Sequence, residues 1–127
     1  MIVIDASAAV LGLLNDGDAR GYLADEPFAC PHLADSEILH ALRGQVSRGD
    51  VDAADAELAV AAWARLGMRR VAVVGMLERV WELRENLSAY DATYVAVAEA
   101  LDSPLLTADA RLARAPGVNC PVTVVRT

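Results

Sequence analysis

Met1-Ile2-Val3-Ile4-Asp5-Ala6-Ser7-Ala8-Ala9 is the stretch of sequence that indicates the type of fold. Three consecutive β-branched apolar residues are typical of a strand that is buried on both faces, as in a parallel sheet. The strand ends at Asp5, and open α/β sheets bind their ligands at the carboxyl ends of the strands. Asp5 is therefore a candidate functional group. The alternative is that Asp5 or Ser7 only caps the helix that follows.

Short apolar stretches alternate with segments of helical periodicity along the rest of the chain. The predicted strands are residues 2–4, 28–30, 71–74, 104–107 and 122–125. The predicted helices are residues 8–14, 18–25, 34–47, 50 or 52 to 66, 76–84, 88–101 and 108–115. This alternation predicts one α/β domain spanning residues 1–127, with a parallel sheet flanked by helices on both faces. The helix at 88–101 is apolar almost all round, so it is expected to be buried.

Composition and cysteine usage suggest the compartment. Hydrophobic residues make up 55% of the chain, but no apolar run approaches the roughly 20 residues that span a bilayer. No basic region precedes the first apolar run, so neither a signal peptide nor an anchor is expected and a cytoplasmic location is predicted. Cys30 and Cys120 lie far apart and lack the spacing of zinc ligands. We expect both to be buried, reduced thiols.

The charge balance restricts how the protein meets a phosphate. Eleven basic residues, all of them arginine, face eighteen acidic residues, which gives a net charge of -7. That sign is wrong for a protein that holds nucleic acid by charge alone, so a phosphate-bearing substrate needs a cation between it and the protein. The absence of lysine also excludes a P-loop lysine and Schiff-base chemistry.

Acidic residues from separate segments are expected to meet at one edge of the sheet. In a parallel α/β fold the amino termini of the helices gather where the strands end. The acids predicted at this edge are Asp5, Glu37, Asp91 and Asp109. The sequence thus predicts an acidic rim.

Each of these acids also has a purely structural interpretation. Glu37 can favour the positive end of its helix. Asp91 follows Ser88 in a pattern that resembles a capping box, and Thr107 can cap a helix in which Asp109 is a first-turn acid. An unpaired Asp91 would nevertheless be costly to bury on the apolar face of its helix, so it calls for a cation.

Carboxylates suit a hard divalent cation. Carboxylates, water and phosphate oxygens are the ligands of Mg²⁺ and Mn²⁺, and two such ions can activate a water for in-line attack on a phosphodiester. No cysteine or histidine is placed for a softer metal, since His32 and His40 are expected at the surface. Arg111 and Arg114 follow Asp109 and could contact backbone phosphates, with a solvated face as the alternative.

Four short motifs, in this order and spacing, resemble the PIN-domain ribonucleases, and most closely the VapC-type toxins of bacterial toxin–antitoxin pairs. The motifs are IVIDAS at residues 2–7, SEILHAL at 36–42, YDATYVAVA at 90–98 and LLTAD at 105–109. Together they cover nearly the whole chain. The segment from Gly67 to Leu87 matches the family least, and its role is left open.

The resemblance implies a PIN fold with a five-stranded parallel sheet and metal-dependent cleavage of RNA. Its metal-binding acids would be Asp5, Glu37, Asp91 and Asp109, with one or two Mg²⁺ or Mn²⁺ ions. Ser7 and Thr107 would support these acids through hydrogen bonds from their hydroxyls. Family members usually form homodimers and are inhibited by an antitoxin that lies across the site and a nearby apolar groove. The helix that carries Trp63 resembles part of that groove.

Two other functions remain open at this point. One is a phosphatase with Asp5 as the covalent nucleophile, which the absence of lysine and the small size disfavour. The other is a non-catalytic oligomeric binding module in which the acids only cap helices. The sequence does not identify the RNA target, because recognition of single-stranded RNA depends on pockets and stacking.

Overall fold

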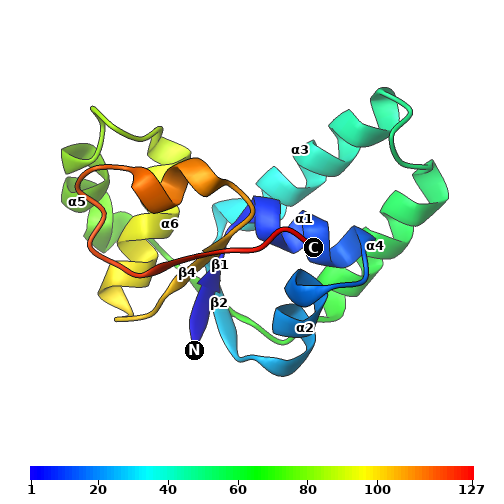
Figure 1. Cartoon of the computed structure of the whole chain (residues 1–127), viewed down its shortest axis with the longest axis horizontal. Coiled ribbons are helices and arrows are strands. Elements are labelled where there is room, and N and C mark those ends of the chain that lie inside the picture. Colours follow the sequence, from blue (N-terminus) through cyan, green and yellow to red (C-terminus); the bar gives the residue numbers. More distant parts are fainter.

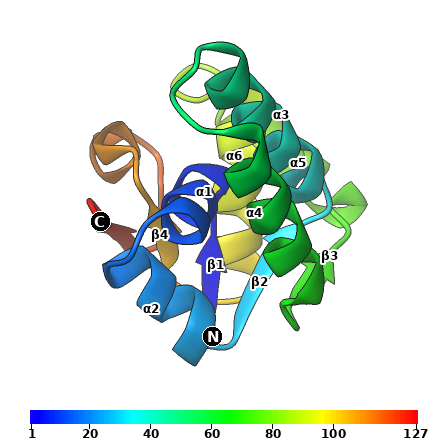
Figure 2. The same cartoon turned by 90° about the vertical axis from the view of Figure 1, so that its right-hand side faces the viewer.

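A five-stranded sheet forms the centre of the computed structural model, which describes residues 1–127. The strands are β1 (Ile2–Ile4), β2 (Phe28–Pro31), β3 (Arg69–Val71), β4 (Leu105–Thr107) and β5 (Val122–Val124). Their order is β3-β2-β1-β4-β5 and all neighbours are parallel. The first strand is therefore central, with β3 at one edge beside β2 (Figure 2). The predicted parallel sheet is confirmed.

Helices cover both faces of this sheet. The helices are α1 (Ala6–Leu14), α2 (Asp18–Asp25), α3 (Leu33–Ser47), α4 (Ala53–Arg65), α5 (Leu77–Glu82) and α6 (Ala89–Ala100). Two 3₁₀ segments are η1 (Val74–Met76) and η2 (Ala110–Arg114). In Figure 1, α1 to α4 lie on one side of the sheet, and α5, α6 and η2 lie on the other. The strand order runs outward in opposite directions from the neighbouring strands β1 and β4, so the connecting helices lie on opposite faces of the sheet. Ligands of α/β folds bind at such a switch point, in the crevice at the carboxyl ends of the strands.

The core is built on β1 and α6. Val3 and Ile4 of β1 and Leu105 of β4 are fully buried. Every residue of α6 from 92 to 98 is also buried, as its apolar sequence predicts. Asp91, in the first turn of this helix, is thereby held in a fixed position at the rim. No helix is both long enough and apolar enough to cross a membrane.

Three predicted elements differ from the structure. The third strand occupies residues 69–71 rather than 71–74, because Arg69 and Arg70 are exposed on an edge strand, where charged side chains are tolerated. The helix expected at 76–84 is divided between η1 and α5. The helix expected at 108–115 is only the 3₁₀ segment η2, which Asp109 caps and which Pro116 follows.

Candidate active site

Asp5 lies at the carboxyl end of β1 and is the N-cap of α1. Its Oδ1 accepts hydrogen bonds from Ser7 Oγ at 2.6 Å and from the Ala8 N–H at 2.9 Å. Its Oδ2 accepts a hydrogen bond from the hydroxyl of Thr107 at the end of β4. Asp5 therefore caps α1, as the structural alternative predicts. The same contacts fix the carboxylate at the carboxyl ends of the neighbouring strands β1 and β4.

The Asp5 carboxyl is only 5% exposed, and no arginine pairs with it. Burial raises the pKa of Asp5, the hydrogen bonds from Ser7, Thr107 and Ala8 oppose that rise, and the negative charge of Asp91 adds to it. Because burying an uncompensated carboxylate is costly, this position favours a cation. Ser7 also joins the two strand ends, since its Oγ accepts the Ala108 N–H at 2.9 Å.

Glu37 projects from α3 and is half-buried. Its Oε1 is buried without a hydrogen-bond partner, and the same is true of the Tyr94 hydroxyl. Burial raises the pKa of the Glu37 carboxyl, the neighbouring Tyr94 hydroxyl opposes this, and the charges of Asp91 and Asp5 raise it further. Tyr94 is thus a close neighbour of Glu37, although the two groups do not form a regular hydrogen bond.

Asp91 lies in the first turn of α6, beyond the N-cap Ser88. Ser88 Oγ accepts the Asp91 N–H at 3.1 Å, so one half of the predicted capping box is present. The Asp91 side chain forms no ion pair. Burial and the charge of Asp109 raise the pKa of Asp91, and Arg111 partly opposes them. This half-buried carboxylate therefore favours additional positive charge.

Asp109 is already paired. Its Oδ1 accepts the Arg111 backbone N–H at 3.0 Å, and its Oδ2 accepts Arg111 Nη2 at 2.7 Å. Arg111 consequently lowers the pKa of Asp109. The Arg111 side chain is 83% exposed, so it can move away into solvent. Asp91, Asp109 and Arg111 line a pocket of about 430 Å³ beside the rim.

The structure brings the acids together in neighbouring pairs rather than around one point. Asp5, Glu37 and Asp91 influence one another electrostatically, and Asp91 in turn influences Asp109. No three acidic, histidine or cysteine side chains are arranged to hold a single ion. The negatively charged carboxylates repel one another, and the Asp109 side chain is directed toward Arg111. The donor set is nonetheless all oxygen, and the buried Glu37 Oε1 has no partner, so the residues fit a hard divalent cation.

The other residues singled out from the sequence lie outside this cluster. His32 and His40 are exposed, as expected. Cys30 is buried and Cys120 is half-buried, so the expectation of burial is wrong for Cys120, and both thiols are free. Trp63 is buried, and its indole donates to Asp35 at 2.7 Å.

Two features of the site are absent from the sequence interpretation. Tyr94 is a buried residue of α6 whose hydroxyl lies beside Glu37, and its spacing of three residues from Asp91 on one helix is the signal for a shared face. The ion pair between Arg111 and Asp109 joins neighbours in sequence, but side-chain direction depends on the local turn. Arg114 is exposed and adds only its charge near Asp109.

Comparison with known proteins identifies similar chains. The PIN domain family model matches residues 2–118. The VapC ribonuclease Mb0985 of Mycobacterium bovis is 54% identical over 125 residues, which are 98% of each chain. The crystal structure of PAE2754 from Pyrobaculum aerophilum has a TM-score of 0.68 and 26% identity, over 95% of this chain and 81% of the other. A toxin–antitoxin complex from Klebsiella pneumoniae has a TM-score of 0.64 at 17% identity, over 97% of each chain.

Proposed function

Because this chain belongs to the PIN-domain family, and within it to the VapC ribonucleases, we propose that its acidic rim cleaves RNA with a bound divalent cation, Mg²⁺ or Mn²⁺. The chain is a nuclease, and so a phosphodiester hydrolase, of the type that serves as the toxin of a toxin–antitoxin pair. This membership sets aside the phosphatase and the non-catalytic binding module. The observation that carries the proposal is the buried Asp5 carboxylate, fixed at the switch point beside Glu37 and Asp91 without an arginine partner.

Each residue of the rim has a proposed part. Asp5 and Asp91 are the central cation ligands, because both are shielded carboxylates that form no ion pair. Glu37 of α3 and Asp109, which follows β4, complete the proposed set of cation ligands. A bound cation supplies an activated water and stabilises the leaving oxygen of the phosphodiester.

Hydroxyls and arginines assist these acids. Ser7 and Thr107 hold the Asp5 carboxylate in one orientation through the hydrogen bonds described above. Arg111 lines the pocket, and Arg114 is exposed on the same 3₁₀ segment, so both can contact RNA phosphates. Arg111 must then exchange its contact with Asp109 for one with the substrate.

A nuclease assay with purified protein tests the proposal. We expect RNA cleavage with Mg²⁺ or Mn²⁺ and none in EDTA, with products that carry 5′-phosphate and 3′-hydroxyl ends. Asp5→Asn and Asp91→Asn should lower the rate by a factor on the order of 10²–10³. Asp25→Asn, an exposed acid on α2, is the matched control. Full activity in either rim variant would overturn the assignment.

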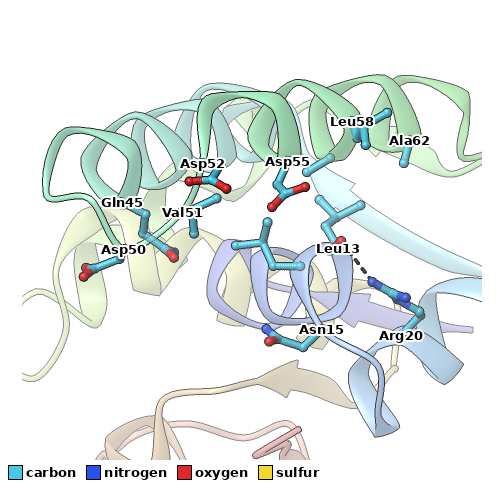
Figure 3. Close-up of a pocket in the computed structure, with 12 residues that line it drawn as sticks. Leu13, Asn15, Arg20, Gln45, Asp50, Val51, Asp52, Asp55, Leu58 and Ala62 are labelled. Carbon is cyan, nitrogen blue, oxygen red and sulfur yellow. Dashed lines mark hydrogen bonds between the residues drawn. The ribbon is translucent and has the colours of Figure 1, made fainter.

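We also propose that the antitoxin docks in a groove between α1 and the loop and helix α4 that follow α3. The groove has a volume of about 700 Å³ and combines apolar side chains such as Leu13 and Leu58 with acidic ones. Figure 3 shows Asp52 and Asp55 directed toward α1 across this space. The lining suits an amphipathic segment with basic residues. Trp63 of α4 is buried and does not line the groove.

Binding of the cognate antitoxin tests this surface. Its gene is expected to be a short open reading frame beside that of the toxin. The double variant Asp52→Asn with Asp55→Asn should weaken binding and reduce its salt dependence, whereas Asp25→Asn should leave both unchanged. Unchanged affinity in the double variant would place the antitoxin elsewhere.

A homodimer is proposed through a different face. Val74, Leu77, Trp81 and Tyr90 are large apolar side chains that are exposed on η1, α5 and α6. These three elements pack against one another, and large apolar side chains exposed on adjacent elements are typical of an interface. Light scattering should give the mass of a dimer for the wild type and of a monomer for Trp81→Glu. A dimer that survives this substitution would contradict the proposed face.

A further inference from the structure

Tyr94 and Glu37 provide an observation that the proposed metal centre does not yet explain. Tyr94 is only 2% exposed, and its hydroxyl oxygen has no hydrogen-bond partner. The buried Glu37 Oε1 also has none, and these are the two unpartnered buried side-chain polar atoms of the whole chain. Leaving a buried donor and a buried acceptor unpaired is unfavourable. Because a hydroxyl that can donate lies beside an oxygen that can accept, we expect a hydrogen bond between them in another state of the site.

The surroundings of Tyr94 leave few partners for its hydroxyl. The residue lies in α6 three positions after Asp91, so the two side chains share one face of a helix that is otherwise buried. Glu37 reaches the same place from α3. Of the two oxygens of the Glu37 carboxylate, only Oε1 is buried without a partner, which leaves Oε2 as the candidate to hold a cation.

We propose that Tyr94 is a positioning residue, whose hydroxyl donates to Glu37 Oε1 when a divalent cation binds and thereby directs Glu37 Oε2 toward the ion. This inference rests on the proposed metal centre. The Glu37 carboxylate would accept a charge-assisted hydrogen bond from the Tyr94 hydroxyl at Oε1 and would hold a cation through its other oxygen. This hydrogen bond would give both buried atoms a partner. Tyr94 itself stays outside the coordination sphere and acts only through Glu37.

Tyr94→Phe tests this role, because it keeps the ring and removes only the hydroxyl. Without metal, the variant should melt about 3 °C higher than the wild type, because it lacks an unpaired buried hydroxyl. Its affinity for Mn²⁺, measured by calorimetric titration of the protein without RNA, should be about tenfold weaker. A purely structural tyrosine would not give higher stability together with weaker metal binding. Tyr22→Phe on α2 is the control and should change neither quantity.

A double-variant cycle with Glu37→Gln identifies the route. If Tyr94 acts through Glu37, Tyr94→Phe should not weaken Mn²⁺ binding any further in the Glu37→Gln background. Wild-type affinity in Tyr94→Phe, an equal loss in both backgrounds, or a lower melting temperature without metal would each overturn the inference. Failure of the metal centre itself would appear differently, as the absence of saturable Mn²⁺ binding in the wild type.

Discussion

The carboxylate of Asp5 caps α1 through Oδ1 and accepts the Thr107 hydroxyl at Oδ2. Asp5→Asn keeps an oxygen for the Ala8 N–H and removes the buried charge, whereas Asp5→Ala removes the cap. We therefore expect the metal-free Asn variant to be at least as stable as the wild type, and the Ala variant to be less stable than the Asn variant by about 1 kcal/mol. Urea unfolding measures both. Equal losses in the two variants would show that the cap is unimportant.

Arg111 competes with a cation for Asp109, because its side chain occupies both carboxylate oxygens. An exposed ion pair is weak, so Arg111→Ala should tighten Mn²⁺ binding by about two- to fivefold. Arg111→Lys keeps the charge but loses the two-pronged contact and should show most of that gain. Calorimetric titration gives the affinities. If only net charge mattered, the Lys variant would bind Mn²⁺ like the wild type.

The sequence predicts where the rim acids stand but not how their side chains are directed. Their places follow from strand ends and helix starts, which local patterns mark well. For Asp5, a cap and a metal ligand occupy the same position, so no local pattern separates them. The direction of Asp109 depends on the turn that brings back Arg111, and the setting of Glu37 depends on Tyr94 from a distant helix.

The packing of α1 against α2 depends on Gly12. A Cβ at this position would lie 2.7 Å from Leu23 Cδ1 and 2.9 Å from the backbone carbon of Ala19. Helix propensity alone favours alanine, but the backbone of α2 would have to move. Gly12→Ala should therefore destabilise the protein by about 1–3 kcal/mol. Gly21→Ala is the matched control, since nothing lies within 4 Å of its Cβ, and it should stabilise by about 0.5–1 kcal/mol. Thermal or urea unfolding of both variants measures these changes in stability.

Helix α6 is joined to α5 and to the segment before β5 by Glu99. Its Oε1 accepts Arg79 Nε at 2.7 Å, and its Oε2 accepts the Asn119 N–H at 2.8 Å. Arg79 lowers the pKa of Glu99 below its ordinary value of 4.5. A depressed carboxyl pKa contributes stability above the unfolded value, and this contribution is lost as the pH falls through the folded value.

Glu99→Gln should therefore destabilise the protein by about 2 kcal/mol near neutral pH. The difference from the wild type should begin to shrink as the pH falls below 4.5 and should continue to shrink until the pH is below the lowered pKa of the folded protein, where the wild-type carboxyl is protonated in both states. Urea unfolding of both proteins across this range measures the difference. A gap that is independent of pH would mean that the ion pair contributes nothing and that the loss comes from packing.

Edge strand β3 illustrates why sequence periodicity fails for some elements. Arg69 and Arg70 do not look like strand residues, and the apolar run that follows them suggests a strand at 71–74. The strand forms earlier because its backbone pairs with β2 and because Arg70 binds Asp35 of α3 at 2.8 Å. That long-range contact leaves no local signal. The central strand β1, buried on both faces, is predictable because burial itself requires its apolar sequence.

The net charge of -7 of the whole molecule opposes the binding of RNA, which is also negatively charged. All four rim acids add negative potential where a phosphodiester must approach, and arginine is the only basic residue type available to offset it. RNA should therefore bind weakly in EDTA and more tightly once Mn²⁺ is added. Fluorescence anisotropy of the wild-type protein with a labelled, non-cleavable RNA analogue measures this, so that the metal ligands stay intact and the substrate is not cut.

Ca²⁺ with the wild-type protein is a second way to follow binding, provided that it does not support cleavage. If the cation bridges protein and phosphate, the affinity should follow metal occupancy and fall in the Asp91→Asn variant. Tight binding in EDTA would instead show that an arginine surface holds RNA without help from a metal. In that case Arg111→Ala and Arg114→Ala should abolish the binding, and the role of the cation would be confined to the chemical step.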